Sequence, residues 1–192
     1  NIDGTILAIS AIMNDGNEPD SNRGHVRVYK YLTGLYVGHR WIQMGNDIDG
    51  ENDGDQFGWS VSLSNDGYIL AIGAPRSKGI YASHAEQYYS DIGQVQIFQY
   101  VQFSNNWVKM VDSLYGESNG DQFGNSLSLS KNGSVLVVSA PYSACEEKPT
   151  NPQKGRVTVF NLLGSVEPPP QLQSKVSSFS KIGDDLYGTE DM

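Results

Sequence analysis

The sequence predicts an all-β fold, namely a β-propeller made of four-stranded antiparallel blades. Two observations predict it. Three sequence signatures recur in the same order along the 192 residues, and each recurrence contains four short strand patterns separated by turn residues. No segment has a convincing helical periodicity. A pair of stacked β-sandwiches is the alternative, but sandwiches rarely repeat side-chain detail at a single period.

The first signature is a long segment that occurs twice. GDQFGWSVSLSNDGYILAIGAP at 54–75 matches GDQFGNSLSLSKNGSVLVVSAP at 120–141, and a copy without the front part, IDGTILAISAI, stands at 2–12. Each long copy contains a hairpin-turn signal, Asn65-Asp66-Gly67 or Lys131-Asn132-Gly133. From the shortened copy we expect an N-terminus that is processed or incomplete.

Two further signatures follow each copy. The second signature is GHVRVYKY at 24–31, GQVQIFQY at 93–100 and GRVTVFNL at 155–162. The third begins with an aromatic residue, at Trp41, Trp107 and Phe179. We therefore expect one domain with three blade units, approximately at 1–53, 54–119 and 120–192. Because closed propellers typically need about 4–8 blades, we expect the chain to be part of a larger propeller, in a longer chain or a larger assembly.

The middle unit predicts the strands and the core. Large apolar residues alternate with Gly and Ser from Phe57 to Ser64, which predicts one apolar face and one face of small side chains that admits another backbone. The second strand is apolar on both faces, which predicts a central position in its sheet. The strands are expected at 57–64, 67–74, 94–100 and 106–111. The expected core comprises Phe57, Val61, Leu63, Leu70, Ile72, Val95 and Ile97, with Phe123, Leu127 and Leu129 at the matching places.

Composition limits the classes of function. The net charge is −9 and the mean hydropathy is −0.41, so the acidic surface repels phosphate backbones and nucleic-acid binding is not expected. No apolar run approaches the ~20 residues of a transmembrane helix. Cys145 is the only cysteine, so no internal disulfide forms and cysteine usage leaves the redox compartment open.

The repeated segments resemble a known family. Phe57-Gly58 followed by Gly73-Ala74-Pro75 is similar to the motif that names the FG-GAP repeats, and Phe123-Gly124 with Ser139-Ala140-Pro141 repeats it with one Gly replaced by Ser. The first unit keeps Ser10-Ala11-Ile12. The chain therefore resembles the FG-GAP family, in particular the propeller of integrin α chains.

This resemblance implies a seven-bladed propeller, extracellular or at the cell surface, that binds proteins or glycans through loops on one face. The function it implies is a non-catalytic binding or scaffold module in protein–protein interaction or adhesion. The calcium loop of integrin-like repeats lies between the FG strand and the GAP strand. Here the tight turns at 65–67 and 131–133 stand in its place, and they offer too few of the six to eight oxygen ligands that calcium takes.

Acidic residues gather instead between the fourth strand and the next FG pair. Asp47, Asp49, Asp53 and Asp55 lie in one glycine-bearing segment, so a calcium ion, if the chain binds one, is expected there. The interpretation that we favour is simpler: Asp55 and Asp121 accept backbone N–H bonds in turns, and the other carboxylates are solvated. Those others include Asp112, Glu117, Asp184, Asp185, Glu190 and Asp191.

Partner recognition is expected in the loops between the second and third strands. These loops, at 13–23, 76–92 and 142–154, are long and unlike one another, and variable loops on a regular scaffold usually carry recognition. The second loop has the side chains typical of contact surfaces: Arg76, Lys78, Tyr81, His84, Tyr88 and Tyr89. The alternative is that this loop packs on its own blade or on the next.

Other functions remain open at this point. A lectin would stack sugars on Trp41, Trp59 or Trp107, although Trp41 and Trp107 stand at a repeated position that is more typical of a core. A structural subunit of a filament or membrane-bound assembly is a further alternative. No Ser–His–Asp order, P-loop or Cys/His cluster points to an enzyme. Asn132-Gly133-Ser134 is a glycosylation sequon on an exposed turn.

Overall fold

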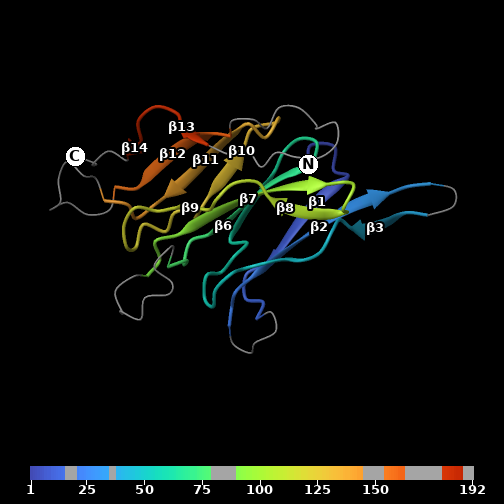
Figure 1. Cartoon of the computed structure of the whole chain (residues 1–192), viewed down its shortest axis with the longest axis horizontal. Helices are drawn as coiled ribbons and strands as arrows, with labels where there is room; N and C mark the ends of the chain where they lie inside the picture. Colours follow the sequence, from blue (N-terminus) through green and yellow to red (C-terminus); the bar gives the residue numbers. More distant parts are fainter. Residues whose placement is uncertain (16–20, 35–37, 79–89, 145–153, 163–178, 188–192) are drawn as a thin grey trace.

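The computed structural model describes residues 1–15, 21–34, 38–78, 90–144, 154–162 and 179–187. In these ranges the chain forms antiparallel strands in three sheets and contains no helix, which confirms the all-β prediction. Closure into a propeller stays a prediction. Figure 1 shows the sheet of β10–β14 at one end of the long axis, the sheet of β1–β4 toward the other, and the sheet of β5–β9 between them.

Each sheet is built on the same plan. The first sheet has the order β1-β2-β3, and β4 also pairs with β2, because β3 pairs with the second half of β2 and β4 with its first two residues. The strands are β1 (Ile6–Ala11), β2 (His25–Leu32), β3 (Arg40–Gln43) and β4 (Ile48–Asp49). Two short strands thus share the outer position of the sheet.

The middle and third sheets add a strand in front. Their orders are β5-β6-β7-β8 and β10-β11-β12-β13, and β9 pairs with β7 as β14 pairs with β12. The middle strands are β5 (Ser60–Leu63), β6 (Ile69–Ala74), β7 (Gln94–Val101), β8 (Asn106–Lys109) and β9 (Leu114–Tyr115). The third sheet contains β10 (Leu127–Leu129), β11 (Val135–Ala140), β12 (Arg156–Asn161), β13 (Ser180–Lys181) and β14 (Leu186–Tyr187).

Two strand predictions need correction. The first strand of the middle unit begins at Ser60 rather than at residue 57, because Gln56 and Gly58 have φ of 55° and 94° and Trp59 N–H closes a turn on Gln56 O. Trp59 is therefore 47% exposed and does not extend an apolar face. The fourth strand ends at Lys109 rather than at residue 111, and the short β9 follows it in the acidic segment before the next FG pair, where no strand was predicted.

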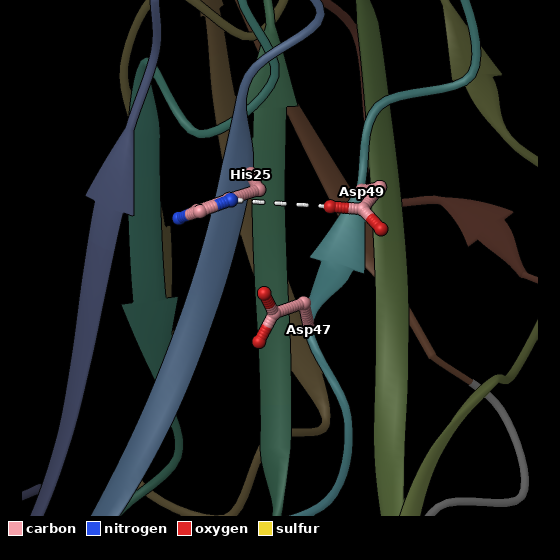
Figure 2. A group of neighbouring side chains, drawn as sticks. All are labelled: His25, Asp47 and Asp49. Atoms are coloured by element: carbon pink, nitrogen blue, oxygen red, sulfur yellow. Dashed lines mark ion pairs between the residues drawn. The ribbon is translucent and has the colours of Figure 1, made fainter. Parts of the chain in front are cut away.

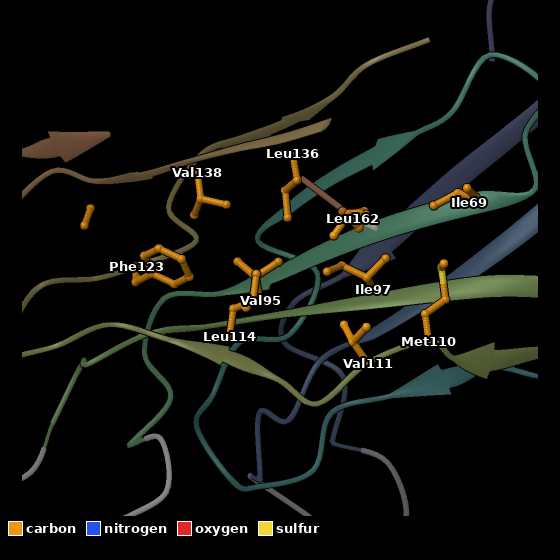
Figure 3. Close-up of a cluster of buried hydrophobic side chains, with 12 residues drawn as sticks. Ile69, Val95, Ile97, Met110, Val111, Leu114, Phe123, Leu136, Val138 and Leu162 are labelled. Atoms are coloured by element: carbon orange, nitrogen blue, oxygen red, sulfur yellow. The ribbon is translucent and has the colours of Figure 1, made fainter. Parts of the chain in front are cut away.

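Two apolar cores lie between the sheets. One lies between the first and middle sheets, and the other, shown in Figure 3, lies between the middle and third sheets. All six residues of β6 are buried, which confirms its predicted central position. Of the predicted core, Phe57, Leu70, Ile72, Val95, Ile97 and Phe123 are buried. Val61, Leu63, Leu127 and Leu129 are only partly buried, because they lie on β5 and β10 at the edges of their sheets.

The small residues of β5 face the next sheet at close range, as predicted. Ser60 Oγ donates to Gly124 O at 2.7 Å, and Ser62 Oγ accepts from Leu129 N at 3.0 Å. A Cβ at Gly73 would stand 2.2 Å from Gly124 O. Larger side chains would hold the two sheets apart, so the Gly and Ser positions set their spacing.

The Phe-Gly pairs join each unit to the preceding sheet. Phe57 N–H donates to Arg23 O at 2.9 Å, and Phe123 N–H donates to Ile92 O at 3.1 Å. A Cβ at Gly24 or Gly93 would stand 2.1 or 2.2 Å from the carbonyl oxygen of the corresponding Phe. Both glycines have positive φ, so each forms a tight seat that only glycine fits.

Candidate functional site

The three variable loops emerge at the same end of the stack. Equivalent parts of successive sheets lie side by side: Ser60 contacts Gly124 at one end of β5, and Asn65 N–H donates to Lys131 O at the other. The loops that follow β1, β6 and β11 therefore share one end of the stack. We name this end the loop end, and it includes the connections 50–56 and 116–122.

Backbone hydrogen bonds tie each connection to the loop of the preceding unit. Gly54 N–H donates to Ser21 O at 2.6 Å, and Gly120 N–H donates to Ser90 O at 3.0 Å. Asp121 Oδ2 accepts the N–H groups of Glu117 and Ser118, each at 3.1 Å. The turn interpretation is thus confirmed for Asp121.

Asp55 stands at the matching position of the first connection, and its surroundings differ. Its Oδ2 accepts from Asn52 Nδ2 at 3.1 Å, and the residue is 2% exposed. Burial raises the pKa of this carboxyl to about 6, because desolvation disfavours the charged form more than the hydrogen bonds from Asn52 and Ser77 favour it. Asp55 is therefore a buried titratable group near neutral pH.

A polar hollow of about 290 Å³ opens at the loop end between the first and second units. Its walls come from three segments that are distant in sequence. Arg23 Nε contacts Asp53 Oδ1 at 2.6 Å, and Lys109 Nζ contacts Glu51 Oε1 at 3.1 Å beside it. The lining residues are Arg23, Glu51, Asn52, Asp53 and Lys78.

Of the residues predicted to bind a partner, Arg76 and Lys78 can be placed. Both side chains are exposed at the loop end, on either side of the buried Ser77, and Lys78 lines the hollow. Tyr81, His84, Tyr88 and Tyr89 lie outside the described residues.

Among the described residues, one group of three potential metal ligands lies close together: His25, Asp47 and Asp49, shown in Figure 2. Their ligand atoms lie within 4.8 Å of one another, and His25 Nδ1 stands 3.9 Å from Asp49 Oδ1. Asp53 and Asp55 are not in this group. The four-aspartate calcium site therefore stays a prediction, and the structure brings His25 together with only two of its members, Asp47 and Asp49.

The carboxylate of Asp47 is already engaged. Arg27 donates to both of its oxygens, at 2.8 and 2.7 Å, and Gln43 donates to Oδ1 at 2.7 Å. The hydrogen bonds from Arg27 outweigh desolvation and lower the pKa of Asp47 to about 2. A metal ion would have to share this carboxylate with a guanidinium, which weakens the group as a metal centre.

The same three positions are polar in every sheet but differ in chemistry. In the middle sheet, Gln94 Nε2 donates to Ser113 Oγ at 2.8 Å and to Tyr115 OH at 3.2 Å. In the third sheet the positions are held by Arg156, Asp185 and Tyr187, matched through the pairing of β12 with β14. Because an uncharged set occupies the place in the middle sheet, the repeat itself indicates a structural polar group rather than a metal site.

Arg156 forms a buried ion-pair network that sequence reasoning missed. Its side chain is 4% exposed and contacts Glu117, Asp121 at 3.3 Å and Asp185 at 3.8 Å. Burial alone would lower the pKa of Arg156, but the hydrogen bond and charge of Glu117 with the other carboxylates raise it. The residue type at 156 has no counterpart in the other units, so the repeat pattern carried no signal for this network.

The other predicted positions lie apart from the loop-end hollow. Trp107 is 7% exposed and its Nε1 donates to Met44 O at 2.8 Å, whereas Trp41 is 44% exposed. Asn132 is exposed on its hairpin turn, where its Oδ1 accepts from Ser130 Oγ and Ser134 Oγ, each at 2.8 Å.

In the described ranges the chain has no helix that could span a membrane.

The segment that contributes most of the residues of the loop-end hollow is similar to a known repeat family. Residues 48–98 match the model of the FG-GAP repeat. The matched FG-GAP segment begins at β4, crosses the first acidic connection and the Phe57-Gly58 seat, and ends in β7. It therefore contains four of the five residues that line the loop-end hollow, namely Glu51, Asn52, Asp53 and Lys78. No curated protein matches the chain.

Proposed function

We propose that the chain is a non-catalytic binding module of the propeller type, as in integrin α chains, that engages a protein at the cell surface or outside the cell. The observation that carries the proposal is the polar hollow at the loop end. It is built by residues of two successive units, which come from two of the variable loops and from the connection at 50–56. The FG-GAP match over residues 48–98 supports a binding module in general.

The charge distribution favours an acidic protein surface as the partner. Arg76 and Lys78 are exposed at the loop end of a chain whose net charge is −9. Positive side chains on an acidic molecule orient an acidic partner toward the face that carries them. Arg23 and Asp53 form an ion pair at the wall of the hollow.

The test is binding of the labelled chain to intact cells of its source, measured by flow cytometry. We expect an Arg76→Glu/Lys78→Glu variant to lose at least tenfold in apparent affinity with unchanged thermal melting. The matched control is Arg40→Glu/Lys131→Glu, which makes the same charge change on exposed residues at the opposite end of the stack. Equal losses in both variants would show a nonspecific charge effect and contradict the proposal.

The same assay separates a protein partner from a glycan. Protease treatment of the cells is expected to abolish binding, whereas enzymatic removal of N- and O-linked glycans is expected to leave it intact. Binding that survives the protease and disappears with the glycans would replace the protein partner with a sugar. In that case the exposed Trp41 and Trp59 become the first residues to substitute.

A further inference from the structure

Two asparagines in this chain are followed directly by glycine, and both pairs have an Asp-Gly counterpart in the preceding copy of the repeat. Asn119-Gly120 matches Asp53-Gly54, and Asn132-Gly133 matches Asp66-Gly67. Hydrolysis of an asparagine side-chain amide gives aspartate. The repeat therefore contains, at the position that matches each asparagine, the residue that such a reaction would produce.

The side chain of Asn132 is held in place by three hydrogen bonds. It lies exposed in the turn between β10 and β11. Its Oδ1 accepts from Ser130 Oγ and Ser134 Oγ, each at 2.8 Å, and from Ser134 N–H at 3.2 Å. A bond from an asparagine side chain to the backbone two residues further on folds the side chain back over the peptide bond between them. The side-chain carbonyl of Asn132 is thereby held beside the backbone nitrogen of Gly133.

The surroundings of this carbonyl favour attack by that nitrogen. The three donors stabilise the negative charge that forms on Oδ1 when a nucleophile adds to Cγ. Gly133 has a φ of 71° and no side chain that would shield its nitrogen. One contact opposes the reaction, because Gly133 N–H donates to Ser130 O at 2.9 Å. The turn must open at this bond and the nitrogen must lose its proton, so the reaction requires base.

We propose that Asn132 deamidates spontaneously in the folded chain, assisted by the hydrogen bonds of its own turn. The deprotonated nitrogen of Gly133 adds to Cγ of Asn132 and closes a succinimide ring. The bond from Cγ to the side-chain nitrogen breaks, and this nitrogen leaves as ammonia after taking a proton from water. Water then adds to either carbonyl of the ring and opens it to aspartate or isoaspartate. The sum is the hydrolysis of an amide, so the reaction needs neither an oxidant nor a reductant.

The aspartate product fits the turn. In the matching turn of the middle unit, Asp66 Oδ1 accepts from Ser64 Oγ at 2.5 Å and from Tyr68 N–H at 3.0 Å, as the side chain of Asn132 does in its own turn. Deamidation adds one negative charge to a chain whose net charge is −9. It also removes the glycosylation sequon, so deamidation and N-glycosylation exclude each other at this residue.

Peptide mapping by mass spectrometry tests the proposal on the unglycosylated chain. The chain is incubated at physiological temperature in neutral and in mildly alkaline buffer, both folded and unfolded in urea. The unfolded chain is the positive control, because both Asn-Gly pairs react there as in a free peptide. In the folded chain, aspartate and isoaspartate are expected to accumulate at Asn132, and faster in the alkaline buffer. A folded chain without product at Asn132 when the unfolded chain has reacted to completion would overturn the proposal.

A serine variant separates assistance by the turn from the ordinary reactivity of an Asn-Gly sequence. Ser134→Ala removes one donor to Oδ1, so deamidation of the folded chain is expected to slow by roughly threefold or more, with an unchanged rate in urea. The matched control is Ser128→Ala, an exposed position on β10 outside the turn, which is expected to leave both rates unchanged. An equal or higher rate in folded Ser134→Ala would overturn the assistance by the turn.

An Asn132→Asp variant tests the fit of the product without waiting for the reaction. Because Asp66 occupies the matching turn, the variant is expected to melt at the same temperature as the unaltered chain. A lower melting temperature would contradict the fit. The binding assay for the loop end does not depend on either result, because it uses residues at the opposite end of the stack.

Discussion

Replacing Gly93 by alanine tests whether the Phe-Gly seat holds the middle and third sheets together. Gly93 has φ of 87°, and a left-handed conformation costs about 1–2 kcal/mol for a residue with a side chain. An added Cβ would stand 2.2 Å from Phe123 O and 2.3 Å from Phe123 N. Because these are backbone atoms, the third unit must move, and overpacking of this kind typically costs about 1–3 kcal/mol more.

Two other glycines separate these contributions. Gly120 has φ of 79° with no atom within 4 Å of a built Cβ, so Gly120→Ala is expected to lose only the conformational part, about 1–2 kcal/mol. Gly155 stands at the matching seat of the third sheet, where the nearest atom is Pro141 O at 3.0 Å. All three glycines have a similar positive φ. The loss of stability in Gly155→Ala is therefore expected to be close to that in Gly120→Ala and smaller than that in Gly93→Ala.

Urea unfolding followed by tryptophan fluorescence measures the three free energies of unfolding. The expected order is a loss of about 2–5 kcal/mol for Gly93→Ala and about 1–2 kcal/mol for the other two. The denaturant dependence of the free energy is compared first, because an altered slope would signal partial unfolding of one unit. Losses for Gly93→Ala and Gly120→Ala that agree within about 0.5 kcal/mol would refute the seat as the joint between units.

Four further predictions concern stability, pH, metal and modification. Leu70→Ala is expected to cost about 2–5 kcal/mol in thermal or urea unfolding, while Leu7→Ala at the exposed counterpart costs under about 1 kcal/mol; equal losses would contradict the core assignment. The folded pKa of Asp55, about 6, exceeds the ordinary 3.8, so its protonation stabilises the fold fully below about pH 4, and this contribution disappears as the pH rises through about 6. Asp55→Asn is therefore expected to gain up to about 3 kcal/mol relative to the unaltered chain between pH 4 and pH 7, and a constant difference over that range would contradict the burial argument. Any heat of calcium binding in calorimetry is expected to vanish in Asp49→Ala/Asp53→Ala, and unaltered binding would move the site elsewhere. Expression through a secretory pathway is expected to add an N-glycan that Asn132→Gln removes, and identical masses with and without a glycosidase would contradict it.

The sequence repeats made much of the strand order predictable. The exact strand boundaries were less predictable, because they depend on backbone conformations that the sequence pattern does not reveal. The second strand of the middle unit was placed correctly because β6 is apolar on both faces and buried throughout. The start of the first strand was wrong because Gln56 adopts a positive φ, as Gln122 does. Glutamine carries no sequence signal for this conformation, and the alternation of large and small residues continued through the turn.

The charged residues show a second limit of prediction from the sequence. Asp47 and Asp53 were grouped by their spacing along one segment, yet each pairs with an arginine on or near β2, at Arg27 and Arg23 respectively. Likewise, His25 joins Asp49 only through the pairing of β2 with β4. Such pairings depend on strand register, which spacing within a single loop does not determine.

The positions that repeat from unit to unit are occupied by residues that join the sheets. The Phe of each FG pair seats on a glycine of the preceding sheet, and Gly73 meets the Gly124 carbonyl. His25, Gln94 and Arg156 bridge to the outer strands of their own sheets or to nearby acidic residues. Because structure accounts for the residues at these repeated positions, we expect the partner that we propose to be recognised by residues outside them that differ between units. Arg76 and Lys78 are exposed residues of this kind at the loop end, and the charge-reversal test therefore begins with them.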